Sequence, residues 1–227
     1  MANPVHTATE QDRLNFRTQI FGNAYFEFHL LPGLDLKTQF GIDSQDRDWK
    51  FYSPKELVSI SSPLGSAQIE NQNSFYWQEE TYLSYKKTVG NHRINGLLGL
   101  SWQERTSNNL LITAQGFADN FFKYNNIGSA TNPSPPRSSN EKWAMNSYFV
   151  RVGYSYKDKY LATATARLDG SSRFGENNKY GYFPSLGLGW IVSEEEFLNK
   201  SSFINFLKIR SSIGVTGNTE IGSYNSL

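Results

Sequence analysis

The heptapeptide GSSRFGE at residues 170–176 is the stretch whose residue types most suggest chemistry. Its glycines, Gly170 and Gly175, are spaced as in loops that bind nucleotide phosphates. Such a loop needs a lysine and then a serine or threonine after the second glycine, because these side chains contact the phosphates and Mg²⁺. Here Glu176 and Asn177 follow instead. The sequence therefore argues against a phosphate loop.

Groups that bind metal ions or carry out acid–base catalysis are few and scattered. The three histidines, His6, His29 and His92, lie far apart in the sequence, which argues against a zinc site. The acidic run DSQDRD at residues 43–48 lacks the ligand spacing and the glycine of an EF-hand loop. We expect no catalytic residue, no metal site and no cofactor.

Composition limits the classes of partner. The chain has 227 residues and a net charge of +1, without a basic cluster, so nothing favours a nucleic-acid partner. Cysteine is absent, which excludes disulfides and thiolate metal sites. No apolar run approaches the roughly 18 residues of a membrane helix. Strands of a transmembrane β-barrel lack such runs too, because only every second side chain faces lipid.

The dominant pattern is a two-residue alternation, which is typical of β-strands. Pro32 and Gly33 occupy the central positions of a predicted type II turn, and Gly90-Asn91 predicts a second tight hairpin. About eight strands are predicted, at residues 24–31, 34–42, 75–87, 92–102, 143–156, 160–168, 182–192 and 206–216.

The connections alternate between short turns and long loops. The long ones are predicted at residues 43–73, 103–141 and 169–181, and the prolines of TNPSPPRSSN in the second argue against a ladder strand there. The medium connection SEEEFLNK predicts one or two helical turns with Ser193 as N-cap and Glu196 at the capping-box position. Short turns at one end and long loops at the other are typical of an outer-membrane barrel.

The alternation also predicts which side chains share a face. Ala162, Ala164, Ala166 and Leu168 form a candidate lipid face. The opposite faces supply candidate lumen-lining residues: Arg151, Thr163, Thr165, Arg167, Lys208 and Arg210. Aromatic residues gather toward both strand ends, as interfacial belts do. Those near the short-connection end are Tyr85, Tyr154, Tyr156, Tyr160, Trp190 and Phe206, and those near the long-loop end are Trp77, Trp102, Trp143 and Tyr182.

The C-terminal third carries a family resemblance. The motifs DGSSRFG, FPS…GW and SEE-FL, followed by LK-R-S-G-TGN-IG-Y, resemble the SusC/RagA family of TonB-linked outer-membrane proteins in order and spacing. The first motif comprises Asp169, Gly170, Ser171, Ser172, Arg173, Phe174 and Gly175. Upstream segments around residues 19–43 and 81–99 look similar as well, so the resemblance covers nearly the whole chain except two long loops.

The resemblance implies an all-β fold: an antiparallel transmembrane β-barrel segment of about eight strands, from a plugged barrel of roughly 22. It implies short periplasmic turns, long extracellular loops and the outer membrane of a Gram-negative bacterium. Residues 1–227 would be a partial barrel domain, since no signal peptide, TonB-contacting segment or plug is recognised in them.

The implied activity is TonB-energised import of nutrients, most often glycans and sometimes peptides, and not an enzymatic reaction. Expected partners are a SusD-like surface lipoprotein, the TonB complex, outer-membrane lipid and the glycan or peptide substrate. The basic lumen residues would hold the plug by salt bridges or contact anionic substrate groups. Loop aromatics at Phe117, Phe121, Phe122 and Tyr124 could stack on sugars, pack on the lipoprotein or form a core of the loop itself.

Two alternatives stay open at the level of sequence. One is a soluble β-rich module that binds carbohydrate on an aromatic platform. The other is an outer-membrane enzyme, which would need a Ser-His pair built from His29 or His92.

Overall fold

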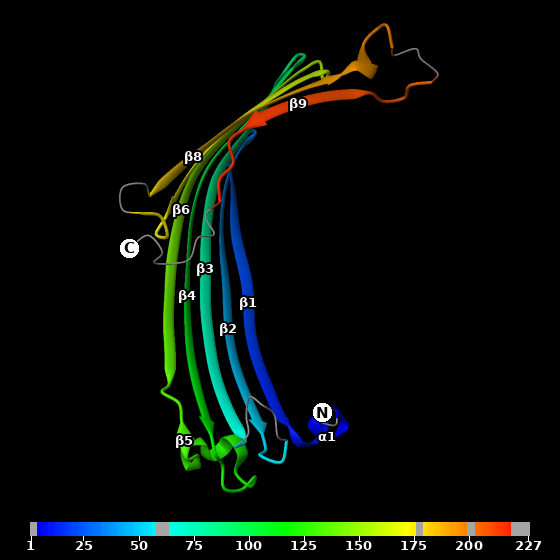
Figure 1. Ribbon diagram of the computed structural model, residues 1–227. Helices are drawn as coiled ribbons and strands as arrows, with labels where there is room; N and C mark the ends of the chain where they lie inside the picture. Colours follow the sequence, from blue (N-terminus) through cyan, green and yellow to red (C-terminus); the bar gives the residue numbers. More distant parts are fainter. Residues whose placement is uncertain (1–3, 58–63, 176–178, 199–202, 219–227) are drawn as a thin grey trace. The chain divides into compact units, whose positions relative to one another are not determined.

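A computed structural model describes residues 4–57, 64–175, 179–198 and 203–218 (Figure 1). One sheet dominates it, with strands in the order β1-β2-β3-β4-β6-β7-β8-β9, so neighbours along the chain are neighbours in the sheet. No helix in these ranges is long and apolar enough to cross a membrane. The strands are β1 (Asp12–Leu31), β2 (Leu34–Ser53), β3 (Ser66–Val89), β4 (His92–Gln115), β5 (Asn132–Pro133), β6 (Arg137–Tyr156), β7 (Tyr160–Ser171), β8 (Tyr180–Ile191) and β9 (Lys208–Gly214). The helical segments are α1 (Pro4–Glu10) and the 3₁₀ turns η1 (Lys123–Ser129) and η2 (Val192–Glu194).

The prediction of about eight strands in an antiparallel sheet is confirmed, but the predicted strands are too short. Residues 43–53 were expected in a loop and instead continue β2, while β4 runs on to Gln115 and β6 begins at Arg137. In these extensions polar residues occupy both faces of the strand, so the hydrophobic alternation disappears. The backbone ladder continues regardless, because its hydrogen bonds do not depend on side-chain polarity.

The expectation that prolines exclude a strand at residues 131–140 is wrong at both ends of this segment, because residues 137–140 already belong to β6. Pro133 belongs to the two-residue strand β5 and lies opposite Ala114 of β4. The flanking residues supply the donors, since Thr131 N donates to Gly116 O at 2.9 Å and Ser134 N donates to Thr113 O at 2.9 Å. Proline is tolerated because its missing N–H faces away from the ladder.

The turn between β1 and β2 forms as predicted. Gly33 has a φ of +80°, which fits the third position of a type II turn. A Cβ there would lie 2.2 Å from the carbonyl oxygen of Lys86, so the neighbouring strand also requires glycine. The Lys86 N–H donates to Gly33 O at 2.7 Å and ties this turn to β3.

The chain forms two compact units, and the long strands contribute to both. The first unit comprises Met1–Gly22, Ile42–Tyr76 and Arg105–Lys142. Its core contains Tyr52, Ala67, Ala114 and Phe117, with Tyr124, Ile127 and Ala130 packed against them. The rings of Tyr52 and Phe117 meet edge to face with centroids 5.5 Å apart.

The second unit comprises Asn23–Gly41, Trp77–Glu104 and Trp143–Leu227, and it contains β7, β8 and β9 whole. Two of its aromatic rings lie over glycines. A Cβ at Gly99 would meet the Phe149 ring at 2.3 Å, and one at Gly181 would meet the Phe183 ring at 2.7 Å. Gly99 leaves room for a ring from the neighbouring strand β6, whereas Gly181 leaves room for a ring of its own strand β8, so close packing at both places depends on a missing side chain.

The predicted helical cap after β8 is wrong. The 3₁₀ turn η2 begins after Ile191, and no side chain caps it, so Ser193 is not an N-cap. The backbone N–H groups of Val192 and Ser193 both donate to Leu207 O, at 2.9 and 3.2 Å. This pairing with the segment before β9, and not a capping side chain, satisfies the first donors of the turn. Residues 199–200 of the predicted segment lie outside the described ranges.

The contact between Gly99 and Phe149 gives a test of the packing. Gly99→Ala in the full-length protein should destabilise the fold by about 1–3 kcal/mol, because the added methyl group overlaps the ring. In a Phe149→Ala background the same change should cost much less. The measurement is urea unfolding of the refolded protein. Gly96→Ala is the control, since no atom lies within 4 Å of its Cβ position; equal costs at both glycines would refute the assignment.

Candidate functional site

The strands β6 to β9 form a sheet with two chemically different faces. Residues directly opposite in an antiparallel ladder project to the same side. The register is Val152–Ala164–Leu186–Ile213 in one row, and Gly153–Thr163–Gly187–Ser212 in the next. Every second row therefore belongs to the same face.

The first of these faces, called the apolar face, has no charged side chain between its two ends. It carries Tyr148, Val150, Val152, Tyr154 and Tyr156 of β6; Tyr160, Ala162, Ala164, Ala166 and Leu168 of β7; Tyr182, Pro184, Leu186, Leu188 and Trp190 of β8; and Ile209, Ser211 and Ile213 of β9. Its residues are not packed into a core: Leu188 is 57% exposed and Ile213 is 77% exposed.

Aromatic rows bound the apolar face along the strands. At the end near the short turns, Tyr156, Tyr160 and Trp190 stand in one row, and the rings of Tyr156 and Tyr160 stack at 6.3 Å. At the other end, Tyr148, Leu168 and Tyr182 form the corresponding row. Aliphatic and alanine side chains make up most of the rows between them, with Tyr154, Pro184 and Ser211 as the exceptions. The face is thus an apolar band with an amphipathic border on each side.

The second face, called the polar face, carries all six candidate lumen-lining residues. Arg151 lies opposite Thr165, Thr163 lies opposite Gly187, and Arg210 lies opposite Gly189. Lys208 lies opposite Ile191 and Arg167 opposite Phe149. The register therefore places these six on one side of the sheet, but spread over three strands and several rows rather than in one cluster.

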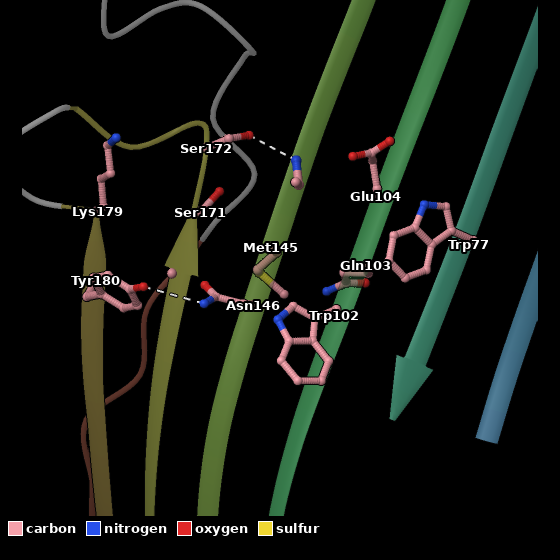
Figure 2. A pocket seen from close by; sticks show the side chains of 12 residues that line it. Trp77, Trp102, Gln103, Glu104, Met145, Asn146, Ser171, Ser172, Lys179 and Tyr180 are labelled. Carbon is pink, nitrogen blue, oxygen red and sulfur yellow. Dashed lines mark hydrogen bonds between the residues drawn. The ribbon is translucent and has the colours of Figure 1, made fainter. Parts of the chain in front are cut away.

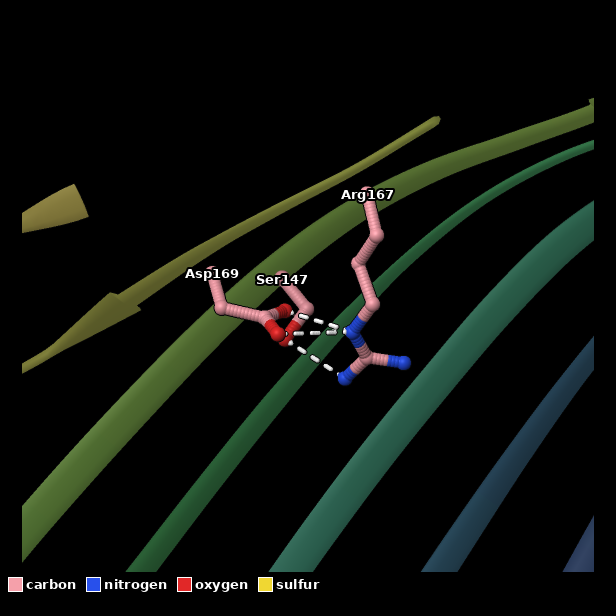
Figure 3. A network of polar contacts seen from close by, with 3 residues as sticks. All are labelled: Ser147, Arg167 and Asp169. Atoms are coloured by element: carbon pink, nitrogen blue, oxygen red, sulfur yellow. Dashed lines mark hydrogen bonds and ion pairs between the residues drawn. The ribbon is translucent and has the colours of Figure 1, made fainter. Parts of the chain in front are cut away.

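Arg167 is the most constrained of them (Figure 3). Its Nε donates to Asp169 Oδ1 at 2.6 Å and to Oδ2 at 2.9 Å, and its Nη2 donates to Ser147 Oγ at 3.0 Å. Asp169 and Ser147 are both buried. The guanidinium carbon also lies 5.9 Å from the centroid of the Phe149 ring. Arg167 is thereby neutralised inside this sheet and joins β7 to β6.

Sequence alternation could place Arg167 and Asp169 on one face, but it could not identify Ser147. That residue becomes a partner only through the register in which Ser147 lies opposite Asp169. No single-strand pattern encodes this register, so the network was missed.

The seven residues of the DGSSRFG motif lie at the end of β7 and in the turn that follows it. Ser172 binds the backbone of β6 in both directions: its N–H donates to Ala144 O, and its Oγ accepts from Ala144 N, each at 2.9 Å. Arg173 lies 4.7 Å above the Trp143 ring. Phe174 N donates to Ser171 O at 3.2 Å. Asp169 belongs to the network described above, and the motif ends at a half-buried Gly175.

Gly170 of this motif also lies in the lining of a surface cavity of about 420 Å³ (Figure 2). A Cβ at Gly170 would meet Asn146 Oδ1 at 2.3 Å and the Tyr180 ring at 2.5 Å, so any larger residue would have to displace these side chains. Asn146 Nδ2 donates to Tyr180 OH at 3.4 Å above it. Trp77 and Trp102 line the other side from β3 and β4.

The end of β8 near the short turns carries a polar cluster that sequence reasoning did not identify. Glu195 Oε1 accepts from Tyr160 OH at 2.7 Å and from Trp190 Nε1 at 3.0 Å. These hydrogen bonds, the Tyr160 one first, hold the pKa of the Glu195 carboxyl below its ordinary value of 4.5, and the Lys159 ammonium adds to the effect. Glu195 thereby fixes two aromatic side chains of the border row.

The loop aromatics divide into two groups. Phe117 and Tyr124 belong to the core of the first unit. Phe121 is 82% exposed and Phe122 is 50% exposed, with their rings 4.9 Å apart in an edge-to-face arrangement. The loop beneath them is fixed by Tyr52 OH, which donates to Asn120 Oδ1 at 2.7 Å. Two of the four residues therefore form the loop's core, and two project from it.

Groups suited to catalysis or metal binding are not assembled in the described ranges. No cluster of three histidine, cysteine or acidic side chains occurs there. His29 Nδ1 lies 2.6 Å from Asp35 Oδ1, and His92 Nδ1 lies 2.7 Å from Tyr154 OH. Neither of these contacts involves a serine hydroxyl, so they do not provide the Ser-His pair that a hydrolase would need.

No family model matches the chain. It is 37% identical over 229 residues to TonB-dependent receptor P39 of Formosa agariphila, covering 99% of this chain and 22% of that protein. It is 30% identical over 209 residues to TonB-dependent receptor SusC of Bacteroides thetaiotaomicron, covering 87% of this chain and 19% of SusC. The chain thus spans about a fifth of the length of these curated relatives.

Solved structures of transporters have a similar fold. The RagAB peptide transporter superposes with a TM-score of 0.85 and 25% identity, covering 96% of this chain and 24% of the transporter chain. The ferric citrate transporter FecA superposes with a TM-score of 0.56 at 9% identity, covering 79% of this chain and 26% of that chain. At that identity FecA supports the fold alone.

Arg167 and Asp169 give a test of the polar network. Arg167→Met in the full-length protein should lower stability by about 1–3 kcal/mol, because the buried carboxylate loses its charged partner. The double variant Arg167→Met/Asp169→Leu should recover most of that loss, since no uncompensated charge remains. Urea unfolding of both variants and of the unaltered protein measures the coupling free energy between Arg167 and Asp169. A double variant as unstable as the single one would contradict the network.

Proposed function

From the premise that this chain belongs to the SusC/RagA family of TonB-dependent receptors, we propose that the whole protein imports nutrients across the outer membrane. Residues 1–227 would then be part of its barrel domain. The single observation that carries the proposal is the two-faced sheet of β6 to β9, in which an exposed apolar band lies behind a polar, cationic surface.

The dimensions of the band support this assignment. The border rows at Tyr160 and Leu168 are eight residues apart on β7, which is about 27 Å along the strand at the usual rise per residue. Tilted strands of an outer-membrane barrel present an apolar band roughly 25 Å tall with aromatic girdles on both sides. A soluble carbohydrate-binding module would instead cover such a face with a second layer.

In this proposal the chain makes and breaks no bond. The polar face would line a wet interior, where hydroxyls of Thr163, Thr165 and Ser185 alternate with basic side chains and glycines. Such a surface offers hydrogen bonds to water and to a hydrated solute. Arg167 would stabilise the sheet and not bind solute, because its charge is already paired with that of Asp169.

For the cargo we expect an oligosaccharide, as the family resemblance implies. A peptide is the second candidate, supported by the likeness to a structure described as a peptide transporter. Expected partners are the TonB complex and a SusD-like surface lipoprotein. The projecting Phe121 and Phe122 are suited to an apolar contact with such a lipoprotein, since an exposed aromatic pair on a fixed loop favours protein association.

Transport is tested by deleting the gene and measuring uptake of labelled oligosaccharides and peptides by intact cells. We expect the deletion to abolish uptake of one of these two classes of solute. The full-length gene should restore that uptake, but not in cells that lack TonB. Uptake unchanged by the deletion, or restored equally well without TonB, would rule out the proposed activity.

The orientation of the faces gives a separate prediction. Ala164→Arg should destabilise the membrane-inserted full-length protein by about 2–4 kcal/mol, because the charge lies in the middle of the lipid face. Thr165→Arg, one residue away on the polar face, should change stability little. Unfolding by urea from lipid vesicles measures both variants, and equal costs at the two positions would reject the facing assignment.

A further inference from the structure

The cavity beside Gly170 lies on the same side of the sheet as the apolar face. Asn146, Gly170 and Tyr180 stand opposite one another in one row. This row is two residues beyond the border row that contains Leu168, toward the long loops, which is about 7 Å along the strand. Because every second residue of a strand projects to the same side, the cavity lies just outside the apolar band and faces away from the polar face.

The lining of the cavity becomes more polar with distance from the band. On β4 it includes Trp102 nearer the band and Glu104 two residues farther toward the loops. On β8 it includes Tyr180, and Lys179 comes just before this strand begins. Figure 2 shows Glu104 and Lys179 on the same side of the hydrogen bond that joins Tyr180 to Asn146. The cavity is thus amphipathic in the direction in which a membrane changes from hydrocarbon to headgroups.

The aromatic side chains of the cavity are open to a ligand. Trp102 is 41% exposed and Tyr180 is 56% exposed. The lining between them includes the small residues Ala144, Gly170 and Ser172. Aromatic rings attract C–H groups to their faces, because these faces carry partial negative charge. Exposed rings beside a floor of small residues are therefore suited to a sugar ring, which has C–H groups on its faces and hydroxyl groups at its rim.

Charged groups lie at the end of the cavity nearer the loops. Lys179 is exposed and pairs with no carboxylate in the part of the chain that the structure describes. An ammonium group in this position can bind a phosphate as a point charge. The Glu104 carboxylate has several acceptor positions, so it can accept hydrogen bonds from sugar hydroxyls in addition to its other contact. A hydrocarbon chain would use neither of these groups.

We propose that this cavity binds the phosphorylated sugar headgroup of a glycolipid in the outer leaflet of the membrane. The sugar ring packs on Trp102 and Tyr180, the phosphate binds Lys179, and the acyl chains lie along the apolar face. The assignment rests on the proposed barrel, in which the apolar face meets lipid. It concerns the outer surface of the barrel wall, whereas cargo would pass the opposite, polar face.

Native mass spectrometry of the purified full-length protein in detergent tests the assignment, with lipid A as the probe. Lipid A is a phosphorylated glucosamine disaccharide with acyl chains, so it presents every group that the cavity would bind. We expect lipid A to fill a single saturable site, and Lys179→Gln or Tyr180→Ala to lower its affinity severalfold. Dephosphorylated lipid A should bind more weakly than lipid A, and Lys179→Gln should not weaken it further.

Lys157→Gln and Tyr182→Ala are the matched controls. Lys157 is an exposed lysine in the turn between β6 and β7, at the opposite end of the strands. Tyr182 is an exposed ring two residues from Tyr180 on the same side of β8, and it does not line the cavity. Neither control should lower the affinity for lipid A as Lys179→Gln and Tyr180→Ala do.

Two outcomes would overturn the proposal. One is an affinity for lipid A that neither Lys179→Gln nor Tyr180→Ala changes. The other is equal binding of phosphatidylethanolamine, which would assign the cavity to membrane lipid of any kind. Uptake should be unchanged in Lys179→Gln, because the site lies outside the proposed path of the solute. Lipid A binding without uptake would therefore reject transport alone, and uptake without lipid A binding would reject this site alone.

Discussion

The hydrogen-bond register between β7 and its neighbours β6 and β8 is the interaction on which the rest of this structure depends. It sets Ala164 beside Val152 and Leu186 on one side, and Thr165 beside Arg151 and Ser185 on the other. A shift by one residue would exchange the two faces of a strand. In the proposed barrel, where the exposed apolar face meets lipid, such a shift would put basic side chains against lipid, and a membrane would disfavour it.

The same register brings together groups that are distant in the sequence. It places Ser147 opposite Asp169, so that Arg167 can bridge β6 and β7, and it aligns Tyr160 with Trp190 so that Glu195 can bind both. These contacts join neighbouring strands of the sheet at two positions along their length. The basic residues of the polar face are thereby divided: Arg167 is paired with Asp169, whereas Lys208 and Arg210 form no ion pair among the described residues.

Sequence alternation is sufficient where the two faces differ in polarity. Residues 160–168 alternate alanine with threonine, and the structure has those residues on opposite sides of β7. It is insufficient where both faces are polar, and residues 43–53 and 103–115 were therefore predicted as loops although the ladder continues through them. Local capping rules failed at Ser193 because a backbone pairing with Leu207, distant in sequence, replaced the helix. Likewise, the need for glycine beside Phe149 and Asn146 is explained only by side chains of neighbouring strands.

The central claim is that β7 separates lipid from a wet interior, and the absence of cysteine from these 227 residues makes it directly measurable. Single cysteines placed at positions 162 to 167 of the full-length protein in lipid vesicles can each carry a nitroxide spin label. We predict that collisions with oxygen, which concentrates in lipid, peak at positions 162, 164 and 166, and that collisions with a water-soluble nickel chelate peak at 163, 165 and 167. A uniform profile, or one with the opposite phase, would contradict the account.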